Sequence, residues 1–146
     1  MEKSVNLKHK FMETFGLKEQ DIRTYSPLTL AYIGDGIFEL VVRTVLVERK
    51  NTQAEKLHKA ATKIVKAETQ ALMAEAIKEE LTEEELSVYK RGRNAKAVTR
   101  AKNATMSEYR RATGFEALMG YLYLKGDMER MIDLIFSGIE KAEVTL

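Results

Sequence analysis

Two acidic residues stand in segments that are otherwise almost entirely apolar, and they are the first candidates for chemistry. Asp35 lies in the middle of LTLAYIGDGIFELVV at positions 28–42, and Glu116 is the only charged residue in GFEALMGYLYL at positions 114–124. Helices of this composition are normally buried, and an unpaired buried carboxylate is unfavourable unless a cation compensates its charge. Two such acids suggest a single shared site, where carboxylate oxygen atoms bind a hard divalent cation such as Mg²⁺.

Each acid also has a simpler explanation. Asp35, Glu39 and Arg43 are four residues apart in turn, so they share a helical stripe that can face water, with an internal Glu39–Arg43 ion pair. Glu116 can likewise face water or pair with a lysine.

Two glycines, Gly34 and Gly36, flank Asp35. Each costs about 1 kcal/mol relative to alanine inside a helix, so some compensating interaction is expected. The pair indicates a close helix–helix contact, room for a metal ion and a phosphate beside Asp35, or both.

A basic segment is the other chemical feature. The net charge of the chain is only +2, but the stretch from Tyr89 to Arg111 holds eight basic residues and one acid. This segregation indicates an anionic partner, and cations mixed with glycine and asparagine suit a phosphate backbone better than a purely solvated loop. The residues expected to contact RNA are Lys90, Arg91, Arg93, Asn94, Lys96, Arg100 and Lys102.

The composition limits the remaining possibilities. A chain of 146 residues with 45% apolar and 32% charged residues suits one folded domain over residues 1–146. The absence of cysteine excludes disulfides and thiolate chemistry and fits a reducing compartment. No signal peptide, membrane span or nucleotide-binding glycine loop is recognisable, so a cytoplasmic location without membrane contact is expected.

The spacing of apolar residues predicts an all-α fold of about seven helices. Ser26 and Pro27 suit the start of a long helix that runs to Arg49, and T-x-x-E patterns at Thr52 and Thr82 predict two capping boxes. Gly92 is expected to end a helix. The predicted helices cover residues 7–16, 27–49, the stretch from 52 to 77 with a possible break near Lys66, 82–90, a short turn at 107–112, 114–125 and 127–140, with an exposed basic loop at about 90–106.

Two motifs resemble those of the ribonuclease III family. LTLAYIGDGIFELVVR (28–43) resembles the signature helix of that family, and TGFEALMGYLYLKGD (113–127) resembles its second motif, in which a glutamate precedes an alanine–leucine pair. The similarity covers roughly residues 20–142. The LAYIGD signature, KRGRNAK (90–96) and a chain that ends directly after the nuclease domain fit the short Mini-III branch, which lacks a double-stranded-RNA-binding domain.

The resemblance implies a ribonuclease III-type endonuclease domain that forms a two-fold homodimer and hydrolyses double-stranded RNA. It also implies dependence on Mg²⁺, with Mn²⁺ as a substitute, 5′-phosphate and 3′-hydroxyl products, and maturation of the large-subunit (23S) ribosomal RNA precursor. Asp35 and Glu116 match the family's catalytic, metal-binding acids. Where the wider family has further acids, this chain has Leu28, Ala31 and Thr113.

Two alternatives remain from the sequence. A domain of the same fold can act as a non-catalytic RNA-binding or ribosome-associated module, because fold does not determine function. A helical scaffold whose basic segment binds an acidic protein is the other alternative. A nuclease assay on duplex RNA and the salt dependence of RNA binding separate these readings.

Overall fold

The structure is a computed structural model that describes residues 7–95 and 105–146. All regular elements within these residues are helical, which confirms the predicted all-α class. They are α1 (Leu7–Phe15), the 3₁₀ turn η1 (Ile22–Thr24), α2 (Pro27–Arg49), α3 (Ala54–Val65), α4 (Ala67–Ile77), the 3₁₀ turn η2 (Lys78–Glu80), α5 (Glu83–Asn94), α6 (Met106–Lys125) and α7 (Met128–Lys141).

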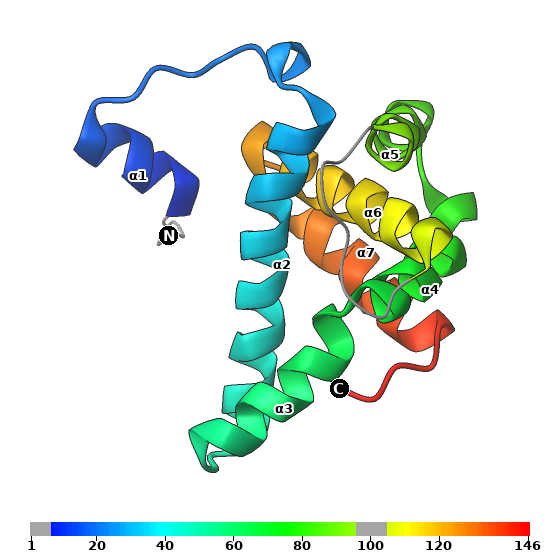
Figure 1. Cartoon of the computed structure of the whole chain (residues 1–146). Coiled ribbons are helices and arrows are strands. Elements are labelled where there is room, and N and C mark those ends of the chain that lie inside the picture. The colour runs from blue at the N-terminus through cyan, green and yellow to red at the C-terminus, as the bar shows by residue number, and fades with distance from the viewer. Residues whose placement is uncertain (1–6, 96–104) are drawn as a thin grey trace.

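Helix α2 runs along much of the molecule (Figure 1). Its start is as predicted, because the Ser26 side chain accepts a hydrogen bond from the backbone N–H of Thr29 at 3.2 Å and Pro27 occupies the first turn. One face of α2 is buried in the core, while Asp35 lies on an exposed part of the helix.

Helix α6 is the central element and packs against α2, α4 and α5. The sequence predicted a short turn at 107–112 and a separate helix from residue 114, and this prediction is wrong. A single helix begins after Thr105, whose side chain forms a capping box with Glu108, and it continues through Thr113 and Gly114 to Gly126. The burial of Thr113 and Gly114 against neighbouring helices explains why these weak helix formers do not interrupt it.

Helices α2 and α6 cross at two glycines. A Cβ atom on Gly34 would lie 1.7 Å from the carbonyl oxygen of Glu116, and one on Gly120 would lie 1.9 Å from the carbonyl oxygen of Leu30. The two backbones therefore touch directly, and Figure 1 shows α6 passing behind α2 at this level. Next to the crossing, the buried rings of Phe38 and Phe115 pack edge to face with centroids 5.2 Å apart.

Helix α5 is longer than predicted. It opens with the expected Thr82–Glu85 capping box but continues through Gly92 to Asn94. Gly92 serves packing rather than termination, because a Cβ atom there would lie 2.7 Å from the Cβ of Ala117 on α6. The predicted loop at about 90–106 is thus helical at residues 90–94 and at Met106, whereas residues 96–104 lie outside the described part.

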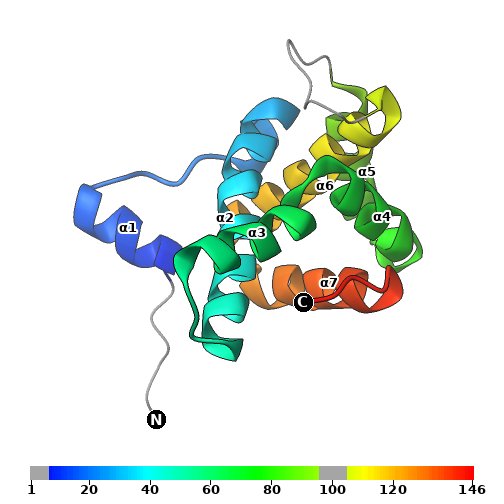
Figure 2. The same cartoon turned by 60° about the horizontal axis from the view of Figure 1, so that its bottom comes forward.

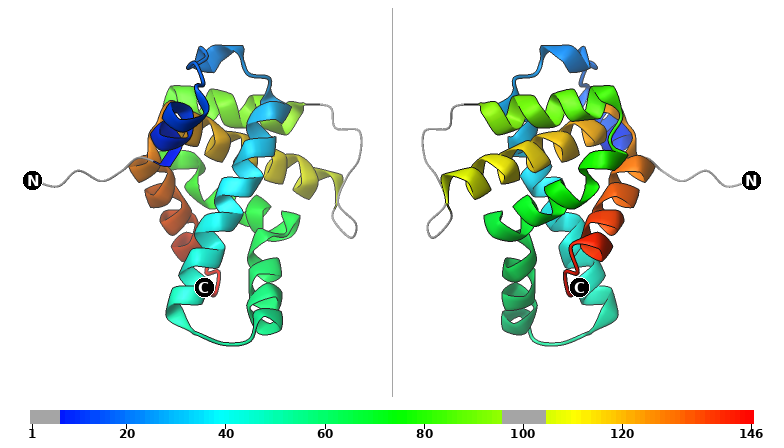
Figure 3. Two further views of the ribbon diagram at one scale, coloured as in Figure 1. Left: turned by 90° about the vertical axis from the view of Figure 1, so that its left-hand side faces the viewer. Right: turned by 90° about the vertical axis from the view of Figure 1, so that its right-hand side faces the viewer.

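Helices α3 and α4 are separated at Lys66, where a break was expected. The predicted capping box at Thr52 and Glu55 is wrong, since α3 is preceded by Gln53 and no side chain caps it. The two views of Figure 3 show α3 folded back along the end of α2 as a helical hairpin.

The remaining helices lie around this frame. Helix α7 packs against α4 and α6 (Figure 2), and its Arg130 donates to both carboxylate oxygen atoms of the buried Glu85 on α5 at 2.9 and 2.8 Å. Helix α1 buries no residue and stands to one side of the other helices in Figure 1. Within the described ranges, no helix combines the length and apolar character that a membrane crossing requires.

The glycine crossing makes a stability prediction. We expect Gly34→Ala to destabilise the protein by about 1–3 kcal/mol or more, because the new methyl group would meet backbone atoms that cannot move aside. Gly36→Ala is the matched control, since a Cβ atom there meets no atom within 4 Å and alanine favours the helix by about 1 kcal/mol. Urea denaturation measures both, and equal stability of the two variants would contradict the close crossing.

Candidate active site

The α2–α6 crossing brings the two predicted acids together. Asp35 directly follows Gly34 on α2, and Gly34 contacts the backbone of Glu116 on α6. The Asp35 carboxyl group lies near enough to Glu116 for its negative charge to raise the pKa of that residue. The convergence expected from the sequence is therefore present in the structure.

The electrostatics of Glu116 are unusual for a carboxyl group. Burial raises its pKa to about 8, the negative charge of Asp35 adds to this rise, and a hydrogen bond from Gln70 opposes it. Among the described residues, no lysine, arginine or histidine forms a salt bridge with Asp35 or Glu116. Ionising both carboxyl groups is unfavourable without a cation, so the pair has the electrostatic character of a cation site.

The simpler explanation, a stripe that faces water with an internal Glu39–Arg43 pair, agrees with the exposure of Asp35 and Arg43. Arg43 donates through Nε to Glu39 at 3.0 Å, which confirms the predicted Glu39–Arg43 pair. Asp35 takes no part in that pair. Its negative charge instead raises the pKa of the Glu116 carboxyl group.

The donor set is small. Ala31 is a buried apolar residue, and the hydroxyl of the buried Thr113 donates to the carbonyl oxygen of Tyr109 at 3.0 Å. Within the described ranges, no three His, Cys, Asp or Glu side chains gather as a metal cluster. The site thus offers two carboxylates, whose hard oxygen atoms suit Mg²⁺ with several retained water molecules.

Gln70 is the neighbour that the sequence analysis missed. It lies on α4 with 1% of its surface exposed, and its Nε2 donates to Glu116 Oε2 at 3.2 Å. The sequence offered no distinguishing signal for it, because the helix 67–77 also holds Glu68, Thr69 and Glu75.

The predicted RNA-contacting residues separate into two groups. Four of them lie in the last turn and a half of α5, where Lys90, Arg91 and Asn94 are exposed and Arg93 is half-buried. The other predicted contacts, at positions 96, 100 and 102, lie outside the described residues; they are Lys96, Arg100 and Lys102.

A basic pocket of about 650 Å³ lies between the end of α5 and the start of α6. Arg93 and Asn94 line it from α5, and Arg110 and Arg111 line it from α6. Glu75 on α4 also lines it, and its carboxylate lies 3.8 Å from the Arg111 guanidinium, so three arginines face one acid. The sequence counted both α6 arginines in the basic segment but did not select them as contacts. Arg110 and Arg111 lie in the first turns of the continuous helix α6, which the sequence analysis did not predict, and there they line the same pocket as Arg93.

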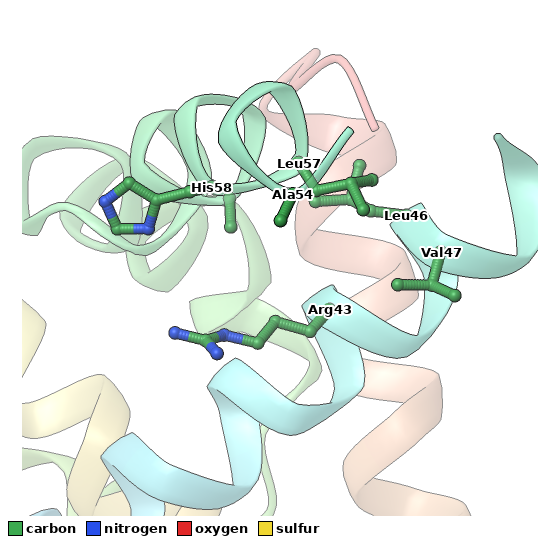
Figure 4. Close-up of a pocket in the computed structure, with 7 residues that line it drawn as sticks. Arg43, Leu46, Val47, Ala54, Leu57 and His58 are labelled. Carbon is green, nitrogen blue, oxygen red and sulfur yellow. The ribbon is translucent and has the colours of Figure 1, made fainter. Parts of the chain in front are cut away.

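Another pocket, of about 190 Å³, lies between α2 and α3 (Figure 4). Arg43 and His58 face it from the two helices, and the other lining residues are apolar. Arg43 is eight residues beyond Asp35, or roughly 12 Å along the helix. With no carboxylate in its lining, this pocket is not part of the acidic site.

The helical fold and the paired carboxyl groups define the class of protein, and comparison with known proteins agrees. Residues 28–127 match the Ribonuclease III domain, so the chain belongs to the ribonuclease III family. The family confirms the expected endoribonuclease activity.

Individual relatives indicate which branch of the family this chain resembles. Mini-ribonuclease 3 of Clostridium tetani is 46% identical over 80% of this chain and 78% of its own length, and Mini-ribonuclease 3 of Enterococcus faecalis is 48% identical over 86% and 97%. A crystal structure of a Fusobacterium nucleatum protein is 35% identical, superposes with a TM-score of 0.75, and matches 83% of this chain and 97% of the other. The resemblance to the Mini-III branch is confirmed.

The raised pKa of Glu116 predicts how stability depends on pH. The group has an ordinary pKa of 4.5 and a pKa of about 8 in the folded protein. Between these values the folded state holds a proton that the unfolded state has lost, so the metal-free protein loses stability as the pH rises from about 4.5 to about 8.

Glu116→Gln removes this titration, and its stability should fall less over the same interval. Urea denaturation in EDTA at several pH values compares the two proteins. Parallel curves for the variant and the wild type would contradict the predicted electrostatics.

Proposed function

We propose that this chain is a divalent-metal-dependent endoribonuclease that cuts double-stranded RNA, with Asp35 and Glu116 as its catalytic metal ligands. The observation that carries the proposal is the half-buried Glu116 carboxyl group beside the charge of Asp35, with no salt bridge to a cation among the described residues. We infer Mg²⁺ as the resident metal, with Mn²⁺ as a substitute, because the donors are carboxylate oxygen atoms.

The two carboxylates have a defined role in the reaction. When bound, the divalent ion activates water and offsets the negative charge that develops on the scissile phosphate. Asp35 and Glu116 hold it at the α2–α6 crossing, where the glycine contact limits their relative movement. Asp35 is exposed, so a phosphate can approach from solvent, whereas the more buried Glu116 anchors the site to the core. Hydrolysis is proposed to leave 5′-phosphate and 3′-hydroxyl ends.

The basic end of the α5–α6 pair is proposed to grip the RNA backbone. Arg110 precedes Glu116 by six residues on one helix, about 9 Å along its axis, so the basic pocket and the acidic pair lie within the span of one duplex. Arginine and asparagine side chains contact phosphate and sugar oxygen atoms without reading bases. Lys90, Arg91, Lys96, Arg100 and Lys102 are proposed to extend this contact.

A two-fold homodimer is part of the proposal. Exposed apolar residues follow a stripe on α2 at Leu28, Tyr32 and Leu40, with Gly36 between them. An exposed apolar stripe of this kind favours a protein interface, and a C2 dimer would present one acidic site to each RNA strand. Of the two glycines that flank Asp35, Gly34 faces α6, whereas a Cβ atom on Gly36 would meet open space.

The proposed substrate is the precursor of large-subunit (23S) ribosomal RNA, and the proposed location is the cytoplasm. The similarity to proteins named Mini-ribonuclease 3 supports the substrate.

Removing one metal ligand tests the function. Asp35→Asn and Glu116→Gln should each lower cleavage of duplex RNA by at least about 100-fold, the effect of losing one group that stabilises the transition state, while RNA affinity changes little. Glu39→Gln is the matched control on the same helix, because Glu39 pairs with Arg43 rather than with the site. Gel assays of cleavage and binding measure both effects. Full activity of either variant would refute the assignment, as would a wild-type protein that binds duplex RNA but never cuts it.

The dimer has its own test. Tyr32 is 82% exposed in one chain, so Tyr32→Asp should leave the fold intact and convert the dimer to monomer in sedimentation experiments. Phe136→Asp is the control, because Phe136 is also an exposed aromatic residue but lies on α7. A Tyr32→Asp variant that stays dimeric would exclude this stripe as the seam.

A further inference from the structure

Gln70 occupies a position that simple packing does not explain. Its side chain is buried on α4, where Nε2 donates to the carbonyl oxygen of Val65 at 2.7 Å and to Glu116 Oε2 at 3.2 Å. The two hydrogen atoms of Nε2 are thus both used, one on the end of α3 and one on the acidic site. This amide is a direct link between the α3–α4 break and Glu116.

The remaining atom of this amide group is left without a partner. Gln70 Oε1 is buried, and among the described residues no group donates a hydrogen bond to it. An unsatisfied buried acceptor costs about 1–3 kcal/mol, so an apolar residue of similar size would be the more stable choice if packing alone mattered. The side chain cannot simply be reversed, because Oε1 would then face the carbonyl oxygen of Val65.

Gln70 is not the only side chain that donates a hydrogen bond to a carbonyl oxygen at the end of α3. The hydroxyl of its neighbour, Thr69, donates to the carbonyl oxygen of Lys63 at 2.6 Å and so serves the same helix end. Thr69 is also buried, with 7% of its surface exposed. The feature that distinguishes Gln70 from Thr69 is its contact with the carboxylate.

The hydrogen bond from Gln70 restricts the Glu116 carboxylate. Of the two carboxylate oxygen atoms of Glu116, Nε2 of Gln70 donates only to Oε2. This bond limits rotation of the carboxyl group and leaves Oε1 of Glu116 unbound by Gln70. Outer hydrogen bonds of this kind orient metal ligands and commonly contribute about 10–100-fold to metal affinity or activity. The small donor set makes the orientation of each carboxylate important.

We propose that Gln70 is a positioning residue, which holds the Glu116 carboxylate in the orientation needed to bind the divalent cation. This inference rests on the proposed function, because it takes Glu116 as a metal ligand. Gln70 touches neither the RNA nor the metal in this role. It acts only through Glu116.

The test compares Gln70→Met with Thr69→Val. Methionine keeps the length and approximate volume of glutamine but donates no hydrogen bond, whereas Thr69→Val removes a bond at the same helix end without touching Glu116. Mn²⁺ affinity is measured by calorimetry on the RNA-free protein. Cleavage is then measured as kcat and KM for duplex RNA over a range of Mg²⁺ concentrations.

We expect Gln70→Met to weaken Mn²⁺ binding by about tenfold or more, with KM for RNA unchanged and kcat recovered at high Mg²⁺. Thr69→Val should bind Mn²⁺ as the wild type does. Wild-type Mn²⁺ affinity in Gln70→Met overturns the proposal, and so does an equal loss in Thr69→Val, which would indicate a general effect of the helix end.

Two further measurements keep the outcome unambiguous. Gln70→Leu is the second variant if the methionine protein does not fold, as judged by circular dichroism, and the same expectations apply to it. Asp35→Asn separates the two levels of inference. If it binds Mn²⁺ as well as the wild type, the proposed metal site itself fails, whereas a loss of binding in Asp35→Asn but not in Gln70→Met refutes only the role of Gln70.

Discussion

Direct contact between two helix backbones is the constraint on which the rest of this structure depends. Gly34 on α2 and Gly120 on α6 remove the side chains that would otherwise hold the helices apart, and each lies against a carbonyl group of the opposite helix. Because side-chain directions in a helix follow from backbone position, this contact also decides where Asp35 and Glu116 meet. The same glycines that allow close packing therefore define the distance between the two carboxyl groups.

Placing two carboxyl groups side by side is electrostatically unfavourable when both are ionised. Burial and the charge of Asp35 raise the pKa of Glu116 to about 8, so the metal-free protein keeps a proton where a cation would otherwise lie. Such paired carboxyl groups with strongly perturbed pKa values are typical of functional sites. The Phe38–Phe115 contact next to the helix crossing belongs to the packed core that offsets this local cost.

The proposed RNA contact and one of the two proposed catalytic acids lie on the same helix, α6. Its first turns carry Arg110 and Arg111 beside the end of α5, and its middle carries Glu116. Glycine packing recurs here, because Gly92 and Gly114 let α5 and α6 approach closely. One continuous helix thus connects a pocket lined by arginines with an acidic pair suited to a cation.

The sequence by itself determined the helical class, most helix starts and the two acids, because each depends on local spacing: Ser26 and Pro27 open α2, Thr82 opens α5, and Asp35 and Glu116 stand out against apolar neighbours. The continuity of α6, the extension of α5 past Gly92 and the contact of Gln70 with Glu116 were decided only by tertiary structure. Gly92 and Gly114 look like helix ends in the sequence, and only the close approach of another helix compensates their low propensity. Gln70 has no local signature of its function, since its meaning comes from Glu116, a residue distant in the chain that folding places within hydrogen-bonding distance.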